Sequence, residues 1–247
     1  MFRSLATAAS GMEAQQTKLD VTANNIANAS TTGYRADRVN FDRMMLNGQP
    51  LHSRQFAAQE IKDIDRKNGT VTQTARPLDI AVQGDAWIAV QAANGSEAYT
   101  RRGDLSVAPS GVLETGDGFP VMGSGGPITV PPHQSISIAN DGTVSIVPPG
   151  GNPNQPQILD RIKLVSPEGS NTVKGLDNNL HVKGGGILPD DLDATVQSGS
   201  LEQSNVNLTQ ALVDMIENQR SYEVQANLLK EAKSMDESTA SLMRLPA

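Results

Sequence analysis

The chain of 247 residues contains no cysteine, so disulfide bonds and thiolate chemistry are excluded. Aromatic residues make up 3% of the sequence, which disfavours a base-stacking platform or an aromatic-lined ligand pocket. The longest apolar run, residues 87–90, is far below the ~20 residues that cross a bilayer, and we expect no direct membrane insertion. No apolar run typical of a secretory signal occurs near the N-terminus, so any export is expected to proceed without a cleaved signal peptide. The net charge of −7 makes nucleic acid an improbable partner.

Glycine and proline are scarce at both ends of the chain. Residues 67–200 hold 19 of the 22 glycines and 12 of the 14 prolines, and both residue types interrupt helices. The middle of the chain therefore favours strands and turns, and the ends favour helices. Short β-branched or alternating runs predict strands at 70–74, 78–82, 87–91, 98–101, 128–130, 135–138, 143–147 and 158–165.

The N-terminal stretch carries a narrow apolar stripe. Leu5, Met12, Leu19 and Ile26 recur at every seventh residue, which is the spacing of a heptad seam. Gly33 suits a helix stop that follows Thr31 and Thr32. This pattern predicts a long helix that packs along one side.

The C-terminal stretch carries two apolar stripes on opposed sides of a helix. The first stripe lies within about 100° of arc at 3.6 residues per turn and contains Leu208, Leu212, Met215, Tyr222, Ala226 and Leu229. The second contains Val213, Val224, Leu228, Met235 and Leu242. Either Asn205 or Asn207 could cap the start of this helix. A helix that is apolar on two opposed sides needs several neighbours, which indicates assembly.

We therefore predict an α+β fold in which the long N- and C-terminal helices pair as a coiled-coil-like assembly domain around a central antiparallel all-β domain. The expected division is an N-terminal helix at 1–33, an extended connector at 34–67, a β-rich domain at 68–202 and a C-terminal helix at 203–247. The connector includes a basic cluster of Arg35, Arg38 and Arg43.

No residue pattern argues for catalysis, a cofactor or a metal. His52, His133 and His181 are far apart in sequence, and the acidic run 190–193 lacks the glycine and distal glutamate of a calcium loop. The glycine-rich runs 123–126 and 184–186 are not followed by the Lys-Ser/Thr of a phosphate-binding loop. Two other classes of protein stay open: a secreted β-rich binding module with a dimerising helical stalk, and a hydrolase that uses two carboxylates of the β domain.

Two asparagine-rich patches stand out, at 24–34 and 204–208. Asn, Ser and Thr at helix ends ordinarily satisfy free backbone groups. That explanation does not cover Asn24 and Asn25, which lie inside the predicted helix and lower its propensity. Their amides are expected to hydrogen-bond to neighbouring helices.

These residues resemble a known family. The run 10–35, with Asn24-Asn25-Ile26-Ala27-Asn28, is similar to the N-terminal signature of bacterial flagellar rod and hook proteins, and the run 204–223 is similar to their C-terminal signature. Residues 76–101 look most like the proximal rod members of the family. The distal rod members are the alternative, although their usual phenylalanines are replaced here by Ala86-Trp87-Ile88.

The resemblance implies a structural axial subunit of the flagellar basal-body rod, with no enzymatic activity. It would be exported by the flagellar type III apparatus into the periplasmic rod and would polymerise helically to transmit torque. The implied partners are other copies of the chain, other rod proteins and the export apparatus. The expected assembly interface consists of Leu5, Met12, Leu19, Asn24, Asn25, Ile26, Asn28, Asn205, Leu208, Leu212, Met215, Tyr222, Val224, Leu228 and Leu229.

Overall fold

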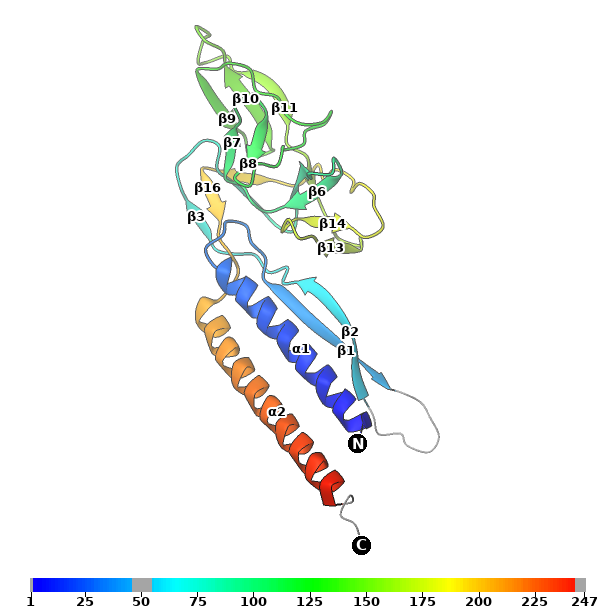
Figure 1. Ribbon diagram of the computed structural model, residues 1–247. Helices are drawn as coiled ribbons and strands as arrows, with labels where there is room; N and C mark the ends of the chain where they lie inside the picture. Colours follow the sequence, from blue (N-terminus) through cyan, green and yellow to red (C-terminus); the bar gives the residue numbers. More distant parts are fainter. Residues whose placement is uncertain (1, 46–54, 243–247) are drawn as a thin grey trace. The chain divides into compact units, whose positions relative to one another are not determined.

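The fold divides into two compact units, each described here by itself. The computed structural model describes residues 2–45 and 55–242, with side chains for 11–39, 63–231, 233–235 and 238. The helical unit comprises Met1–Ala27, Asp37–Asp63 and Asn207–Ala247. The β module comprises Asn28–Ala36 and Ile64–Val206 (Figure 1).

The helical unit contains two helices and a two-stranded sheet. Helix α1 spans Phe2–Ala27 and α2 spans Leu208–Leu242, while strands β1 (Asp37–Met45) and β2 (Gln55–Ile64) pair with each other. Asn207 is the N-cap of α2, because its Oδ1 accepts a hydrogen bond from the Gln210 amide at 3.1 Å. Neither described helix has an apolar stretch that could cross a bilayer.

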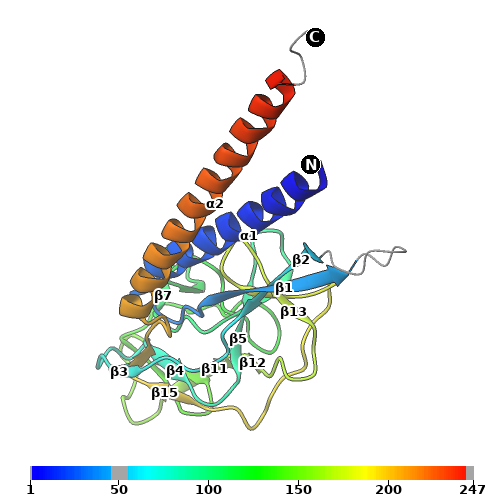
Figure 2. The same cartoon turned by 90° about the horizontal axis from the view of Figure 1, so that it is seen from below.

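The prediction of terminal helices paired as a coiled coil is wrong. A coiled coil buries apolar side chains at its seam, but the buried side chains described in these helices are Gln15 and Ala211. Gln15 Nε2 donates to the backbone oxygen and to Oδ1 of Asn218, so a polar contact joins the helices. Figure 2 shows them approach near the end of α1 and the start of α2 and then diverge.

A polar groove lies between α1, α2 and β1. Its volume is about 270 Å³, and its lining includes Lys18, Asn25, Asp37, Asp214 and Glu217. Charged and amide groups prefer a hydrated space to a dry seam. Polar groups, rather than an apolar seam, therefore lie between the end of α1 and the start of α2.

The segment expected as an extended connector, 34–67, contains the paired strands β1 and β2. Val39 and Phe41 alternate with Arg38, Asn40 and Asp42, but Asp37 and Arg43 occupy the same side as the apolar residues and shorten the alternating run. Strand β1 also packs on α1, so the helical unit is a mixed α and β structure. The first helix ends at Ala27 rather than at residue 33.

Fourteen of the described strands, β3 to β16, lie in the central region and pair antiparallel wherever their register is given. The first seven are β3 (Val71–Gln73), β4 (Ile80–Val82), β5 (Trp87–Gln91), β6 (Glu97–Thr100), β7 (Leu105–Val107), β8 (Leu113–Thr115) and β9 (Ser135–Ile138). The others are β10 (Thr143–Val147), β11 (Gln157–Arg161), β12 (Leu164–Val165), β13 (Thr172–Lys174), β14 (Leu180–Val182), β15 (Val196–Ser198) and β16 (Ser200–Glu202).

These strands form several small sheets rather than one large one. The largest has five strands in the order β12-β5-β6-β14-β13, and a three-stranded sheet has the order β11-β10-β9. The pairs β15-β4, β16-β3 and β7-β8 complete the described sheets of the module. The pairs β15-β4 and β16-β3 each join segments more than 100 residues apart. The last two strands of the module therefore pair with its first two.

Strand β5 separates two apolar clusters, because successive side chains of a strand point to opposite faces. Ile88 and Val90 belong to the larger cluster, whereas Trp87 and Ala89 belong to the smaller one. In the smaller cluster the Leu188 amide donates to the Tyr99 hydroxyl at 2.7 Å. Burial of Tyr99, only partly offset by this hydrogen bond, raises the pKa of its hydroxyl to about 12.

Several strands differ from the expected ones. The expected strand at 128–130 is reduced to an isolated bridge between Val112 and Thr129. The expected run 158–165 is broken into β11 and β12. Strands β7, β8 and β13 to β16 were missed. Each has three residues, and none lies in a longer β-branched or alternating run like those that predicted β3 and β4.

Buried and exposed isoleucines on neighbouring strands give a matched test of this core. Ile146 of β10 is 1% exposed, and Ile158 of β11 is 69% exposed. Replacing Ile146 by Ala should lower the free energy of unfolding by about 2–5 kcal/mol, because it removes packed methyl groups and leaves a cavity. Ile158→Ala should change it by less than about 0.5 kcal/mol. Urea unfolding followed by the fluorescence of Trp87, the single tryptophan, measures both; equal losses would contradict the assignment of the core.

Candidate assembly interface

The asparagines inside α1 bind a strand. Asn25 Nδ2 donates to the Asp37 carbonyl at 3.0 Å, and the Asp37 amide donates to Asn25 Oδ1 at 2.8 Å. Asn24 Nδ2 donates to the Asp37 carboxylate at 2.8 Å. The Asn25 amide thus pairs with the backbone at the start of β1 as another strand would. The described partner of both asparagines is β1, whereas we expected neighbouring helices.

Asn205 ties together three segments of the β module. Its Nδ2 donates to the carbonyls of Asp65 and Lys67, each at 2.9 Å, and its Oδ1 accepts from the Ala36 amide at 2.7 Å. The Asn205 amide also donates to the Tyr34 carbonyl at 3.2 Å. Replacing this side chain by an apolar one would leave several backbone groups without these partners. Asn205 therefore acts as a structural clamp.

Asn28 begins a turn after α1. The amide and hydroxyl of Thr31 both donate to Asn28, to its carbonyl and its Oδ1 respectively, at 3.1 Å. The chain then reaches Gly33, which has φ of +68°. A Cβ at Gly33 would lie 2.4 Å from the backbone of Arg101, and the Gly33 amide donates to the Glu202 carbonyl at 2.8 Å. Only glycine fits this close approach in this backbone conformation.

A buried ionic cluster lies beside that turn. Glu202 is 1% exposed, and its carboxylate contacts Arg35 Nη2 at 2.8 Å and Arg101 Nη2 at 2.7 Å. It also accepts from the Gly69 amide at 2.7 Å. Arg101 donates further to the carbonyls of Val82, Gly84 and Ala86, which satisfies its guanidinium within the module.

Arg35 is less completely satisfied. Its guanidinium donates to the Lys67 carbonyl and to Asn68 Oδ1, and its Cζ lies 6.0 Å from the centre of the Trp87 ring. Its buried Nε has no hydrogen-bond partner among the described atoms. Burial lowers the pKa of Arg35, although the nearby charge of Glu202 opposes that shift.

This cluster was not predicted from the sequence. Arg35 was expected to lie with Arg38 and Arg43 in a basic connector, whereas it is buried against Glu202. Arg101 and Glu202 carried no pattern that would link them, being 101 positions apart. A usable signal was the position of Arg35 directly after Gly33 and Tyr34, at the end of the N-terminal signature.

The first predicted stripe of α2 is only partly covered. Met215, Tyr222 and Leu229 are half-buried, while Leu208 and Leu212 are exposed. On α1, Met12, Leu19 and Ile26 are half-buried and Asn24 is exposed, while the side chain of Leu5 lies outside the described residues. The structure therefore brings part of the predicted set together on the facing sides of the two helices.

The second stripe of α2 is exposed. Val224 is 58% and Leu228 is 60% exposed, and Val213, Ile216 and Met235 are exposed on the same side. At 3.6 residues per turn these five residues lie within about 120° of arc, nearly opposite the half-buried Tyr222. Leu242, which we assigned to this stripe, has a side chain outside the described set. We call Val213, Ile216, Val224, Leu228 and Met235 the exposed stripe.

Comparison with known proteins agrees with the resemblance. A model described as "Flagella basal body rod protein" matches residues 5–35, and one described as "Flagellar basal body rod FlgEFG protein C-terminal" matches 197–242. A third, "Flagellar hook protein FlgE/F/G D1 domain", matches 81–146. The flagellar basal-body rod protein FlgF of Salmonella typhimurium is 42% identical over 88% of this chain and 87% of the relative. The chain belongs to the flagellar basal-body rod protein family.

Two further rod proteins support this membership. FlgF of Escherichia coli is 41% identical over 85% of both chains. FlgG of Bacillus subtilis is 33% identical over 99% of this chain and 100% of the relative. The family is one of structural rod proteins, and the higher identities make this chain FlgF-like. Among the described residues, no three His, Asp or Glu side chains are grouped so that they could hold a metal ion.

The segments matched by the rod models contain the residues of the buried cluster. Arg35 ends the N-terminal match, Arg101 lies within the central match and Glu202 lies within the C-terminal match. The cluster therefore joins the three parts of the rod-protein sequence inside one module. Asn205, in the C-terminal match, reinforces the same junction.

The cluster yields a stability prediction. Glu202→Gln removes the charge that compensates two buried guanidinium groups and should destabilise the module by about 3–5 kcal/mol. Glu168→Gln is the control, because Glu168 is exposed and makes no described ion pair. Urea unfolding followed by Trp87 fluorescence measures the difference. A Glu202→Gln protein as stable as the control would show that the two arginines do not depend on this carboxylate.

Proposed function

We propose that this chain is a subunit of the proximal flagellar rod that polymerises helically through its helical unit and transmits torque. The observation that carries the proposal is the exposed stripe of α2. Contiguous exposed apolar surface on a chain of a rod-protein family is the surface expected at a subunit contact. The half-buried residues facing α1 and the exposed stripe lie on opposed sides of one helix, so the second side is available to a neighbour.

A rod requires contacts that do not close on themselves. When different surfaces of two identical subunits meet, each subunit keeps a free surface for the next copy, and an open helical filament results. The exposed stripe of one copy would meet a different surface of the next. The expected partners are other copies of this chain and adjacent rod proteins.

The subunit would pass through the flagellar type III export apparatus without a cleaved signal peptide and assemble in the periplasmic part of the basal body. The identities of 42% and 41% to two FlgF proteins support the proximal position. The full-length match to a FlgG protein makes the distal position the second candidate. Electron microscopy of basal bodies carrying a labelled copy distinguishes the two by the distance of the label from the inner membrane.

The exposed stripe is tested with a double charge substitution. Val224→Asp with Leu228→Asp should leave the monomer folded, because both side chains are more than half exposed. It should stop rod assembly, because buried charges without partners cost several kcal/mol at a contact. The expected result is normal synthesis and export, but no filaments and no swimming.

The matched control is Gln219→Asp with Lys230→Gln. It changes the net charge by the same amount, and both residues are exposed on α2 away from the exposed stripe. The control should assemble and swim. Normal swimming by the Val224 and Leu228 variant would show that the exposed stripe is not an assembly contact.

A further inference from the structure

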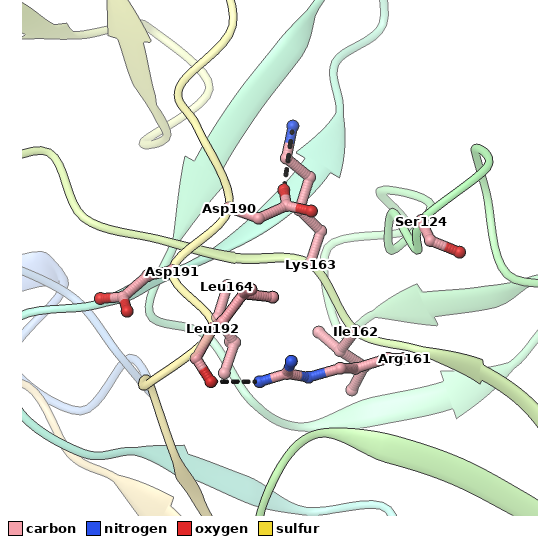
Figure 3. A pocket seen from close by; sticks show the side chains of 8 residues that line it. All are labelled: Ser124, Arg161, Ile162, Lys163, Leu164, Asp190, Asp191 and Leu192. Carbon is pink, nitrogen blue, oxygen red and sulfur yellow. Dashed lines mark hydrogen bonds and ion pairs between the residues drawn. The ribbon is translucent and has the colours of Figure 1, made fainter.

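A small apolar pocket lies at the β12 edge of the five-stranded sheet. It has a volume of about 120 Å³, and buried Ile162 and Leu164 line it together with Leu192. Ile162 is 1% and Leu164 is 2% exposed, so Leu192, at 74%, supplies most of the apolar side-chain surface that is accessible from outside. Figure 3 shows Leu164 and Leu192 beside each other, with Ile162 next to Arg161 and with Lys163 next to Asp190. The space suits one aliphatic side chain.

The charged groups around the pocket already have partners. Arg161 donates from Nη2 to the Leu192 carbonyl at 3.0 Å and from Nε to the Asp141 carbonyl at 2.7 Å. Lys163 Nζ contacts both oxygens of Glu97, at 2.8 and 2.9 Å, and lies 3.7 Å from Asp190. These contacts hold Arg161 and Lys163 in place and satisfy their charges, so the centre of the pocket favours an apolar group over a charged one.

The opposite edge of the same sheet carries a projecting leucine. Leu176 lies in the turn between β13 and β14 and is fully exposed. The turn is braced by a hydrogen bond from the Gly175 amide to the Asn179 carbonyl at 2.8 Å and by His181 Nε2 at 3.0 Å from the Asp177 carboxylate. Burial opposes ionisation of Asp177, but hydrogen bonds from His181 and Asn179 outweigh it and lower the pKa of the carboxyl. The leucine is therefore presented by an ordered turn, which reduces the entropy lost on binding.

We propose that Leu176 of one copy inserts into the Ile162, Leu164 and Leu192 pocket of a second copy. The sheet order β12-β5-β6-β14-β13 places the pocket and the leucine at opposite edges, about 19 Å apart at four strand spacings. A projection and a pocket on opposite edges make a heterologous contact that repeats without closing. The partner is therefore a further copy of this chain.

Charge supports the same pairing. Exposed Lys183 directly follows β14, on one side of the Leu176 turn, whereas the Lys174 ammonium at the end of β13 already donates to the Arg35 carbonyl. Asp190 and Asp191 line the pocket and Asp193 follows them; Asp190 lies 3.7 Å from Lys163, which leaves Asp191 and Asp193 to attract Lys183. Opposite charges around an apolar centre favour a defined orientation of the two copies.

Other exposed aliphatic residues fit less well. Ile187 is exposed but lies only three residues before Asp190, on the chain segment that leads to the pocket itself. Ile158 belongs to β11, in the three-stranded sheet. Leu176 alone among these three lies at the opposite edge of the five-stranded sheet. The contact goes beyond the proposed role of the helical unit, because it joins β modules.

Engineered cysteines test the contact, since the chain has no native cysteine. We place Leu176→Cys and Leu192→Cys in one full-length chain, express it in place of the native protein and oxidise isolated basal bodies. A disulfide needs Cβ atoms about 3.5–4.5 Å apart, which the two edges of one sheet cannot provide. The expected result is a ladder of disulfide-linked multimers of this chain, absent from either single-cysteine variant.

A control pairs Leu192→Cys with Ile187→Cys and should give no ladder. Three outcomes would overturn the inference: assembled basal bodies without a ladder, a dimer from Leu176→Cys alone, or a product whose mass shows another protein bound at residue 192. The first outcome leaves the proposed rod function intact. Loss of that function would instead appear as basal bodies that lack this chain.

A solution measurement covers the case in which the cysteine variants do not assemble. Leu176→Asp should weaken self-association of the full chain about 10- to 100-fold in sedimentation equilibrium, because one leucine is no longer buried. Ile187→Asp is the control and should leave self-association unchanged. Equal behaviour of the two variants would also overturn the inference.

Discussion

The carboxylate of Glu202 is the group on which the β module depends. It lies between the guanidinium groups of Arg35 and Arg101, and it accepts from the Gly69 amide. Arg35 lies in the segment after α1, Arg101 directly follows β6, Gly69 lies just before β3, and Glu202 ends the last strand, β16. Two buried positive charges are tolerated because one buried negative charge lies between them. The junction fixes where the chain enters and leaves the module.

The two units differ in how they are held together. The β module has two apolar clusters separated by β5, together with a clamp of asparagine and backbone hydrogen bonds at Asn205. The helical unit relies on polar contacts, such as Gln15 to Asn218 and Asn25 to Asp37, around a polar groove. Apolar burial stabilises the first unit, whereas much of the apolar surface of α2 stays exposed. Under our proposal, neighbouring copies cover that surface during assembly.

The assembly interface remains a prediction, and the structure shows which contacts some of its residues make within the chain. Asn24 and Asn25 were recognised as unusual in a helix, but their described partner is β1, a strand in the segment that we expected to be an extended connector. The opposed stripes of α2 could be read from spacing alone, since 3.6 residues per turn fixes which side chains share a side. Which stripe is covered depends on packing with α1, which no spacing encodes.

By itself, the sequence determined the helical ends, the β-rich middle and the family, because periodicity, glycine and proline placement and long signatures are local properties. Tertiary structure decided what is joined across long separations. Arg101 meets Glu202 over 101 positions, and β15 pairs with β4 across more than 100 residues. Such contacts arise when the whole module closes, because burying a charge requires a compensating charge that only the completed fold brings within 3 Å. Tertiary structure also decided which apolar stripe of α2 is partly covered, because only packing against α1 distinguishes the two stripes.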